Sequence, residues 1–292
     1  MPLPLWKQVA LQAYVMGSSP CRAALRRLAE RSGKAPIMIL FYHRVADHEP
    51  NQWTMDCETF AWQMGWLRDN FELVSLEEAQ HRIRAGINRR PCVSVTFDDG
   101  YADNCNFALP LLRDLRIPCT YFVTTENVLL GKPFQHDVQR GIPLAPNSLE
   151  QLREFSAHGV EIGAHTKTHA DLGCVQGARR MREEVVDAGR ELGLALSRRV
   201  RYFAFPFGRH HNLNPAAFWL ARDAGYDAVC SAYGGYNFPG DDPFHLQRIH
   251  ADPECVRLRN WLTLDPRKWA GVERYQYDSP GQSPSPLGAA AP

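Results

Sequence analysis

The sequence predicts an α/β protein in which parallel strands form a closed or nearly closed barrel. Short apolar runs alternate with longer segments of helical periodicity over residues 37–262. Helix-capping residues stand at the junctions between these segments. Seven or eight strand–helix units within about 230 residues suit a barrel better than a small open sheet.

The expected strands are short runs of apolar, β-branched and aromatic residues, as buried parallel strands require. In α/β proteins the ends of such strands point into the ligand crevice, so polar residues directly after them are candidates for a functional site. The expected strands are residues 37–42, 73–74, 92–97, 119–123, 160–162, 202–205, 228–230 and 246–249.

The expected helices lie between these strands and carry capping residues at their ends. Ser148 and Asn214 are expected as N-caps, because their side chains can accept hydrogen bonds from the first turn. Gly159, Gly193 and Gly225 are expected as C-caps. The expected helices are residues 57–69, 76–85, 104–115, 149–158, 175–192, 215–224 and 255–262.

Composition divides the chain into three parts. Residues 1–34 predict amphipathic helices, residues 35–270 the barrel domain, and residues 271–292 a disordered, low-complexity tail. A long loop with several Pro and Gly residues is expected over one rim, at residues 131–147. His136 and Asp137 in this loop are expected to be exposed to solvent, with a position in the lining of the substrate cleft as the alternative.

The N-terminal region predicts neither an export signal nor a membrane span. It lacks a small-residue cleavage pattern, and no window reaches the roughly 18 apolar residues that cross a bilayer. The expected location is therefore the cytoplasm. The helix around Trp6 and Val9 is expected to pack on the domain, with peripheral attachment to a membrane surface as the alternative.

Charge and cysteine content exclude several classes of function. The formal net charge of +1 gives no overall field that would attract nucleic acid, and no obligate protein partner is evident. The eight cysteines stand singly without a CxxC pair, so neither a thiolate zinc site nor a redox dithiol is expected.

Two motifs place chemically active residues directly after expected strands. One provides Asp98 and Asp99, and the other provides His165 and His169. Carboxylates and imidazoles are the usual ligands of catalytic metal ions. Thr166 stands where the zinc-protease pattern H-E-x-x-H has its glutamate, so a general base must come from elsewhere. The aspartate pair can supply both that base and a third ligand.

A third motif, FAFPFG at residues 203–208, is an apolar strand that ends in a turn with exposed backbone N–H groups. With TFDDG at residues 96–100 and HTKTH at residues 165–169, it makes the chain resemble the polysaccharide deacetylase family, also called NodB-homology or carbohydrate esterase family 4. The resemblance spans roughly residues 37–252 and implies a distorted (β/α)7 barrel. The Tyr-His-Arg-Val segment at residues 42–45 resembles the permuted branch that acts on poly-N-acetylglucosamine.

The resemblance implies a role for each motif residue. Asp98 is implied as the catalytic base. Asp99, His165 and His169 are implied as ligands of one divalent metal ion, most commonly zinc, with cobalt or nickel as alternatives. The backbone N–H of Phe207 is implied as a donor to the oxyanion.

The chain departs from the family pattern in two places. Ala204 occupies the position of an arginine that often orients the base, and Arg248 on a late strand is predicted to replace it. The late Leu-x-His motif that supplies the general acid is also missing. Because the first and last strands of a barrel are neighbours, His43 is predicted as the general acid, with His250 as the alternative.

These features predict a metal-dependent hydrolase that removes N-linked acetyl groups from an N-acetylated sugar, in a polysaccharide or a glycolipid precursor. The expected partner is thus an N-acetylated carbohydrate. Two alternatives stay open: a degenerate barrel that binds glycans without turnover, and a metal hydrolase of a non-sugar amide or ester. The presence of the base and all three ligands argues against the degenerate barrel.

Overall fold

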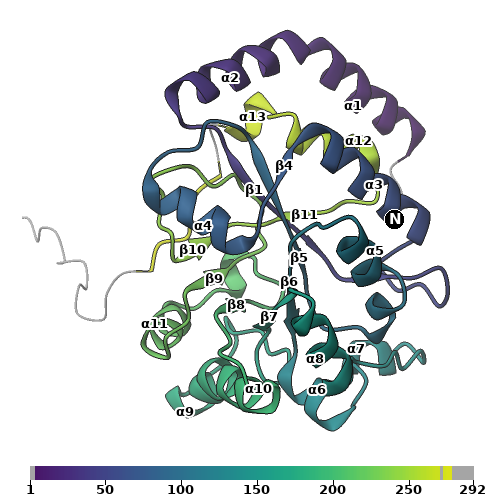
Figure 1. The fold of residues 1–292 in the computed structure, drawn as a ribbon, viewed down its shortest axis with the longest axis vertical. Coiled ribbons are helices and arrows are strands. Elements are labelled where there is room, and N and C mark those ends of the chain that lie inside the picture. The colour runs from purple at the N-terminus through teal and green to yellow at the C-terminus, as the bar shows by residue number, and fades with distance from the viewer. Residues whose placement is uncertain (1–3, 270–271, 278–292) are drawn as a thin grey trace, which may run out of the picture.

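The computed structural model describes residues 4–269 and 272–277, and Figure 1 shows their arrangement. A parallel, curled sheet forms the centre, and helices cover its outer side. The α/β barrel prediction is confirmed. The division into three parts stays a prediction, and most of the expected disordered tail (residues 271 and 278–292) lies outside the described residues.

The strands of the barrel pair in parallel, in the order β10-β9-β8-β7-β6-β5-β1-β11, and β4 pairs with the start of β5. Every residue of β1 and β5 is buried, which explains their continuous apolar sequences. The strands are β1 (Ile37–Tyr42), β4 (Glu72–Leu73), β5 (Cys92–Phe97), β6 (Cys119–Val123), β7 (Glu161–Ala164), β8 (Tyr202–Ala204), β9 (Ala228–Cys230), β10 (His245–Leu246) and β11 (Ile249–His250), with β2 (Arg44–Val45) and β3 (Thr54–Met55) forming a separate pair.

One bent segment closes the barrel. In β10, Leu246 pairs with Cys230 of β9. Three residues later Ile249 of β11 pairs with Leu40 of β1. The start of the segment 245–250 thus lies beside β9, and its end lies beside β1. The predicted neighbourhood of the first and last strands is therefore confirmed.

The helices alternate with the strands, and α1 and α2 lie together at one end, against α12 and α13 (Figure 1). No helix within the described part of the chain is both long and apolar enough to cross a bilayer. The helices are α1 (Leu5–Gly17), α2 (Ser19–Ser32), α3 (Cys57–Asn70), α4 (Leu76–Ala85), α5 (Ala108–Asp114), α6 (Thr125–Leu130), α7 (Gln135–Val138), α8 (Leu149–Ala157), α9 (Ala178–Arg182), α10 (Ala188–Leu196), α11 (Pro215–Asp223), α12 (Cys255–Leu262) and α13 (Pro266–Trp269), with the 3-10 turns η1 (Ala102–Cys105) and η3 (His210–Asn212) and the π-helical turn η2 (Glu183–Asp187).

The capping predictions are confirmed except at Gly193. The side chains of Ser148 and Asn214 accept hydrogen bonds from the first turns of α8 and α11. The helix expected to end before Gly193 continues to Leu196 and ends at Ser197 in a left-handed conformation. A side chain at Gly193 would approach the Arg198 carbonyl oxygen to 2.8 Å, so the glycine serves close packing rather than capping.

The rim loop is more ordered than its composition predicts. It contains the short helix α7, and the Asp137 carboxylate accepts hydrogen bonds from Tyr101 Oη at 2.8 Å and Asn51 Nδ2 at 3.0 Å. Asp137 is only 1% exposed. The predicted solvent-exposed position is therefore wrong for Asp137, because the loop folds back onto Tyr101, which follows TFDDG. His136 is partly exposed.

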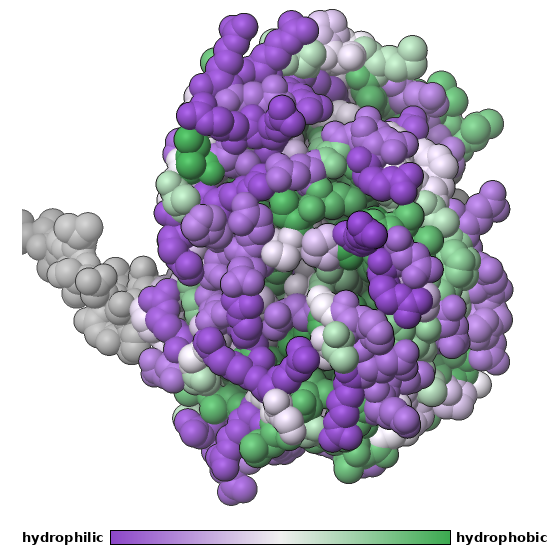
Figure 2. All heavy atoms as spheres, viewed as in Figure 1, coloured by the Kyte–Doolittle hydropathy of each residue, from purple (hydrophilic) through white to green (hydrophobic). Residues whose placement is uncertain are grey.

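Hydrophilic side chains cover most of the face drawn in Figure 2, and hydrophobic ones gather in the hollow near its centre.

Candidate active site

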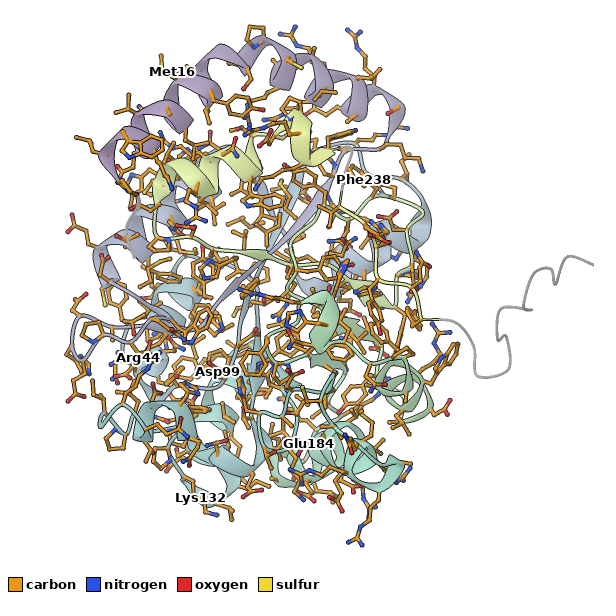
Figure 3. All side chains as sticks on the ribbon, turned by 180° about the vertical axis from the view of Figure 1, so that it is seen from behind. Met16, Arg44, Asp99, Lys132, Glu184 and Phe238 are labelled. Atoms are coloured by element: carbon orange, nitrogen blue, oxygen red, sulfur yellow. The ribbon has the colours of Figure 1, made fainter. Side chains whose placement is uncertain are left out.

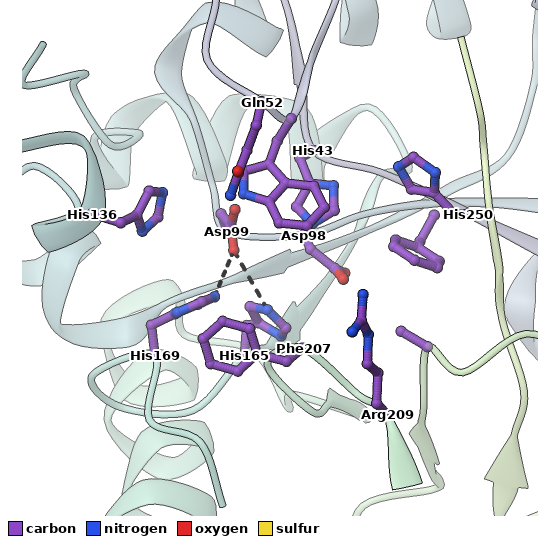
Figure 4. Close-up of a pocket in the computed structure, with 13 residues that line it drawn as sticks. His43, Gln52, Asp98, Asp99, His136, His165, His169, Phe207, Arg209 and His250 are labelled. Atoms are coloured by element: carbon purple, nitrogen blue, oxygen red, sulfur yellow. Dashed lines mark ion pairs between the residues drawn. The ribbon is translucent and has the colours of Figure 1, made fainter. Parts of the chain in front are cut away.

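The functional motifs converge on one cavity at the carboxyl ends of the strands (Figure 4). Its volume is about 320 Å³, within the range of small-ligand pockets. The lining residues are Phe41, His43, Gln52, Trp53, Asp98, Asp99, His136, His165, His169, Phe207, Arg209, Ala232 and His250.

The turn after β5 gives the two aspartates different partners. Asp99 has φ 74°, a left-handed conformation that is uncommon for a residue with a side chain. Gly100 follows with φ 99°, and a Cβ there would lie 3.0 Å from Val123. The Asp99 carbonyl accepts the Thr124 N–H at 2.9 Å, which fixes this turn against β6. Asp98 therefore faces Arg248, whereas Asp99 faces the two histidines of HTKTH.

Asp99, His165 and His169 form a cluster suited to one metal ion. One potential ligand atom from each lies within 4.8 Å of the others. Asp99 Oδ1 is 3.0 Å from His169 Nε2 and 3.5 Å from His165 Nε2, the contacts dashed in Figure 4. Neither contact has hydrogen-bond geometry, so this buried oxygen is unsatisfied within the described residues. An unpaired carboxylate oxygen beside two imidazole nitrogens fits a divalent cation.

The two histidines have different surroundings. His165 Nδ1 donates to the Ala204 carbonyl oxygen at 2.9 Å, which leaves Nε2 free as a ligand. Burial lowers the pKa of His165 to about 4, so its imidazole is neutral at physiological pH. Burial would also lower the pKa of His169, but the Asp99 carboxylate outweighs burial and raises it.

The HTKTH segment is a loop and not a helix. Thr166 and His169 have φ values of 63° and 59°, so left-handed turns, rather than one helical face, bring the imidazoles together. Glu184, in the π-helical turn η2, holds this loop (Figure 3). Its carboxylate is wholly buried and accepts the Lys167 N–H at 2.9 Å, the Thr168 N–H at 2.9 Å and the Thr168 hydroxyl at 2.7 Å.

Asp98 forms a bidentate ion pair with Arg248. Arg248 Nη1 lies 2.6 Å from Asp98 Oδ1, and Nη2 lies 2.8 Å from Oδ2. The guanidinium is 0% exposed and also donates to Thr96 Oγ1 and the Ser231 carbonyl. Burial would raise the pKa of Asp98, but the Arg248 charge outweighs it and lowers that pKa. The Arg248 charge therefore favours the ionised form of Asp98.

The FAFPFG motif ends in a turn that exposes a backbone donor. Phe207 has φ 60°, and its ring lies 5.2 Å from that of His169. Among the described residues, the Phe207 N–H has no hydrogen-bond acceptor. Gly208 follows with φ 58°, and a Cβ there would lie 2.5 Å from the Ala232 nitrogen. This close packing holds the Phe207 N–H at the edge of the cavity.

His43 and His250 occupy the opposite wall together with aromatic rings. The His43 ring stacks on Trp53 at 4.7 Å, and the His250 ring lies 5.2 Å from Phe41. Asn104 Nδ2 donates to the His43 carbonyl at 2.6 Å. Burial lowers the pKa of His43, and the carboxylates of Asp99 and Asp98 oppose this effect. The structure thus brings both candidate acids to one cavity.

Several cavity residues were not identified from the sequence. Gln52 and Arg209 have no local motif that marks them. Glu184 acts on the HTKTH loop from a helix 16 residues away from Thr168 in sequence, and only tertiary packing reveals it. For His136 the alternative prediction holds: it lines the cavity, and its Nε2 lies 2.8 Å from the Tyr101 hydroxyl.

Comparisons with known proteins agree with this geometry. The family described as polysaccharide deacetylase matches residues 85–229. YxkH of Bacillus subtilis, which carries the same family name, is 25% identical over 228 residues, 77% of this chain and 74% of its own length.

Solved structures share the fold. IcaB from Ammonifex degensii is 25% identical, with a TM-score of 0.66 over 78% of this chain and 97% of its own. The deacetylase PplD of Streptococcus pyogenes, solved with acetate, is 21% identical, with a TM-score of 0.67 over 79% and 99%. The BpsB deacetylase domain of Bordetella bronchiseptica is 20% identical, with a TM-score of 0.58 over 74% and 95%.

The fold and the cavity define an α/β-barrel hydrolase with an Asp-His-His cluster at the strand ends. The chain belongs to the polysaccharide deacetylase family, and it is a hydrolase of the deacetylase class.

Proposed function

We propose that this protein is a metal-dependent deacetylase that removes N-linked acetyl groups from an N-acetylated sugar in a polysaccharide or a glycolipid precursor. One observation carries the proposal: an Asp-His-His cluster lies beside an aspartate whose two oxygens are both held by a buried arginine. The cluster supplies metal ligands, and the second aspartate stays outside it as a base.

Asp99, His165 and His169 hold the metal ion in this proposal, with zinc as the first candidate and cobalt or nickel as alternatives. A bound divalent cation polarises a carbonyl group and lowers the pKa of water, which makes amide hydrolysis feasible at neutral pH. The ligand set of two imidazoles and one carboxylate is typical of catalytic zinc sites, which keep a coordination position open.

Three further residues transfer protons or stabilise the negative charge that develops on the carbonyl oxygen. Asp98, kept ionised by Arg248, accepts a proton from the attacking water. The Phe207 N–H donates to the carbonyl oxygen as negative charge develops there. His43 protonates the departing amine. One proton passes from the water to Asp98 and one passes from His43 to the amine. Proton exchange with solvent then deprotonates Asp98 and reprotonates His43, which returns both groups to their starting states.

The shape of the cavity suits a sugar with an acetamido group. Trp53 presents an aromatic face on one wall, and the Asp-His-His cluster lies on the other. Sugar rings pack their apolar faces on aromatic side chains, while the acetamido group reaches the polar wall. A cavity of about 320 Å³ holds one sugar unit, and the neighbouring units of a polymer extend over the rim.

The test measures acetate release from N-acetylglucosamine oligomers by purified protein. We expect activity that a chelator abolishes and that added zinc, cobalt or nickel restores. Full activity in the chelated sample would contradict metal dependence. Tight binding of the oligomers with no turnover in any metal-loaded sample would contradict the enzymatic proposal and favour a glycan-binding role.

A further inference from the structure

The N-terminal helix α1 presents an apolar face to solvent. No residue of α1 is buried, and four large apolar side chains are mostly exposed. The exposed fractions are 76% for Leu5, 68% for Trp6, 58% for Val9 and 69% for Met16. Soluble proteins rarely expose clustered apolar side chains of this size without a binding partner.

These side chains share one side of the helix. At about 3.6 residues per turn, Leu5, Val9 and Met16 project in nearly the same direction, and Trp6 borders them. Ala10 and Ala13 complete this side, so it carries no charge. The other side faces the protein, where the Tyr14 hydroxyl donates to Asp265 Oδ1 at 2.7 Å. The helix is therefore fixed on the domain with its apolar side outward.

The neighbouring helix α2 adds positive charge to the same end of the molecule. Residues 1–34 contain six basic side chains and one acidic side chain, although the whole chain has a net charge of +1. The single acid, Glu30, pairs with Arg26. Arg27 and Arg31 are exposed and have no ion pair among the described residues, and Leu28 beside them is 67% exposed. Figure 2 shows hydrophilic and hydrophobic side chains side by side at this end.

We infer that the surface formed by α1 and α2 binds the surface of an anionic lipid bilayer. An apolar helix side inserts into the headgroup region, and adjacent arginines attract anionic lipids. A second copy of the chain fits less well, because pairing two such surfaces would bring their uncompensated arginines together. The charge of the surface therefore favours a partner that is both apolar and negative.

This contact leaves the catalytic cavity free. β1 begins three residues after Lys34, and the cavity lies at its carboxyl end, about 20 Å away for a six-residue strand. In Figure 3, Met16 of α1 lies at the top of the molecule and Asp99 lies in its lower half. The bound protein would thus present its cavity away from the bilayer plane.

Vesicle sedimentation with the full chain tests this inference. We expect co-sedimentation with vesicles of equal parts phosphatidylcholine and phosphatidylglycerol. Binding should fall at least about tenfold with phosphatidylcholine alone or at high salt. Equal binding to both vesicle types, or to neither, would overturn the inference.

Surface variants separate the contribution of the apolar side chains to membrane binding from that of the arginines. Trp6→Ser with Val9→Ser should weaken binding at least about tenfold, and Arg27→Glu with Arg31→Glu should remove the preference for anionic lipid. The control, Arg190→Glu with Leu194→Ser on exposed positions of α10, should bind like the wild type. All variants should keep the wild-type acetate release. A wild-type dimer in solution that Trp6→Ser with Val9→Ser makes monomeric would instead assign the surface to a second copy and overturn the inference.

Discussion

The two walls of the catalytic cavity are built differently. The chelating wall is formed by Asp99, His165 and His169. The Ala204 carbonyl oxygen accepts a hydrogen bond from His165, and the Glu184 carboxylate accepts hydrogen bonds from the loop between the two histidines. The aromatic wall, formed by His43, Trp53 and His250, is held mainly by ring contacts. Hydrogen bonds fix directions closely, whereas ring contacts tolerate small displacements. The comparison indicates that the chelating wall is more rigid than the aromatic wall.

The largest expected effect on the aromatic wall comes from the general acid. His43→Gln should lower kcat about 10³-fold, because proton transfer to a leaving amine contributes about 10²–10⁴-fold. Zinc content and thermal unfolding should stay at wild-type values, since the His43 side chain is only partly buried in the structure. The matched variant His250→Gln should lose much less activity. The opposite order would exchange the roles of the two histidines.

Removing Arg248 should weaken both activity and stability. Arg248→Ala leaves the Asp98 carboxylate buried without a partner, and such changes cost about 3–5 kcal/mol in the free energy of unfolding. Turnover should fall about 10²-fold while bound zinc remains, and Arg248→Lys should recover part of it. Wild-type turnover in folded Arg248→Ala would show that Arg248 does not support the base.

On the chelating wall, Glu184 should control metal affinity. Glu184→Ala frees the loop between the two histidines, and loss of such supporting bonds typically lowers metal affinity about 10–100-fold. Zinc competition with a chelator measures the change, and excess zinc should restore turnover. Glu183→Ala is the control, because within the described part of the chain Glu183 pairs only with Arg179 and Arg180 near the surface. Unchanged zinc affinity in Glu184→Ala would contradict the rigid chelating wall.

The smallest effect is a shift in pH dependence. The Arg248 charge holds the pKa of Asp98 below its ordinary value near 3.8. The ionised form of Asp98 therefore stabilises the fold above about pH 4, and this contribution is lost as the pH falls through the lowered pKa. In the wild type, protonation of Asp98 should therefore cause no fall in kcat/KM at any pH above about 5. In Arg248→Lys the fall of kcat/KM in acid should move to higher pH. If it does not move, Arg248 is not what lowers the pKa of Asp98.

Local sequence predicted the barrel and the residues that gather in the cavity. Asp98, Asp99, His165 and His169 each follow the end of a parallel strand, and the topology of such sheets brings strand ends together. Arg248 was found because the expected arginine is missing at Ala204. The structure places both of its guanidinium Nη atoms on Asp98.

The rest of the site depends on contacts that sequence spacing does not encode. Glu184 reaches the HTKTH loop from a π-helical turn, and no local pattern predicts such a turn. His136 and Asp137 lie in a segment whose composition is typical of an exposed loop. Tyr101 and Asn51, which are distant in sequence, hold that segment against the cavity.

The most direct test of the account compares Asp98→Asn with Asp99→Asn, because the two residues are adjacent but have different partners. Zinc content and acetate release from N-acetylglucosamine oligomers are measured on the same samples. The account predicts that Asp98→Asn keeps zinc and loses turnover, whereas Asp99→Asn loses both. Substantial turnover in Asp98→Asn, or full zinc content in Asp99→Asn, would contradict this division of labour.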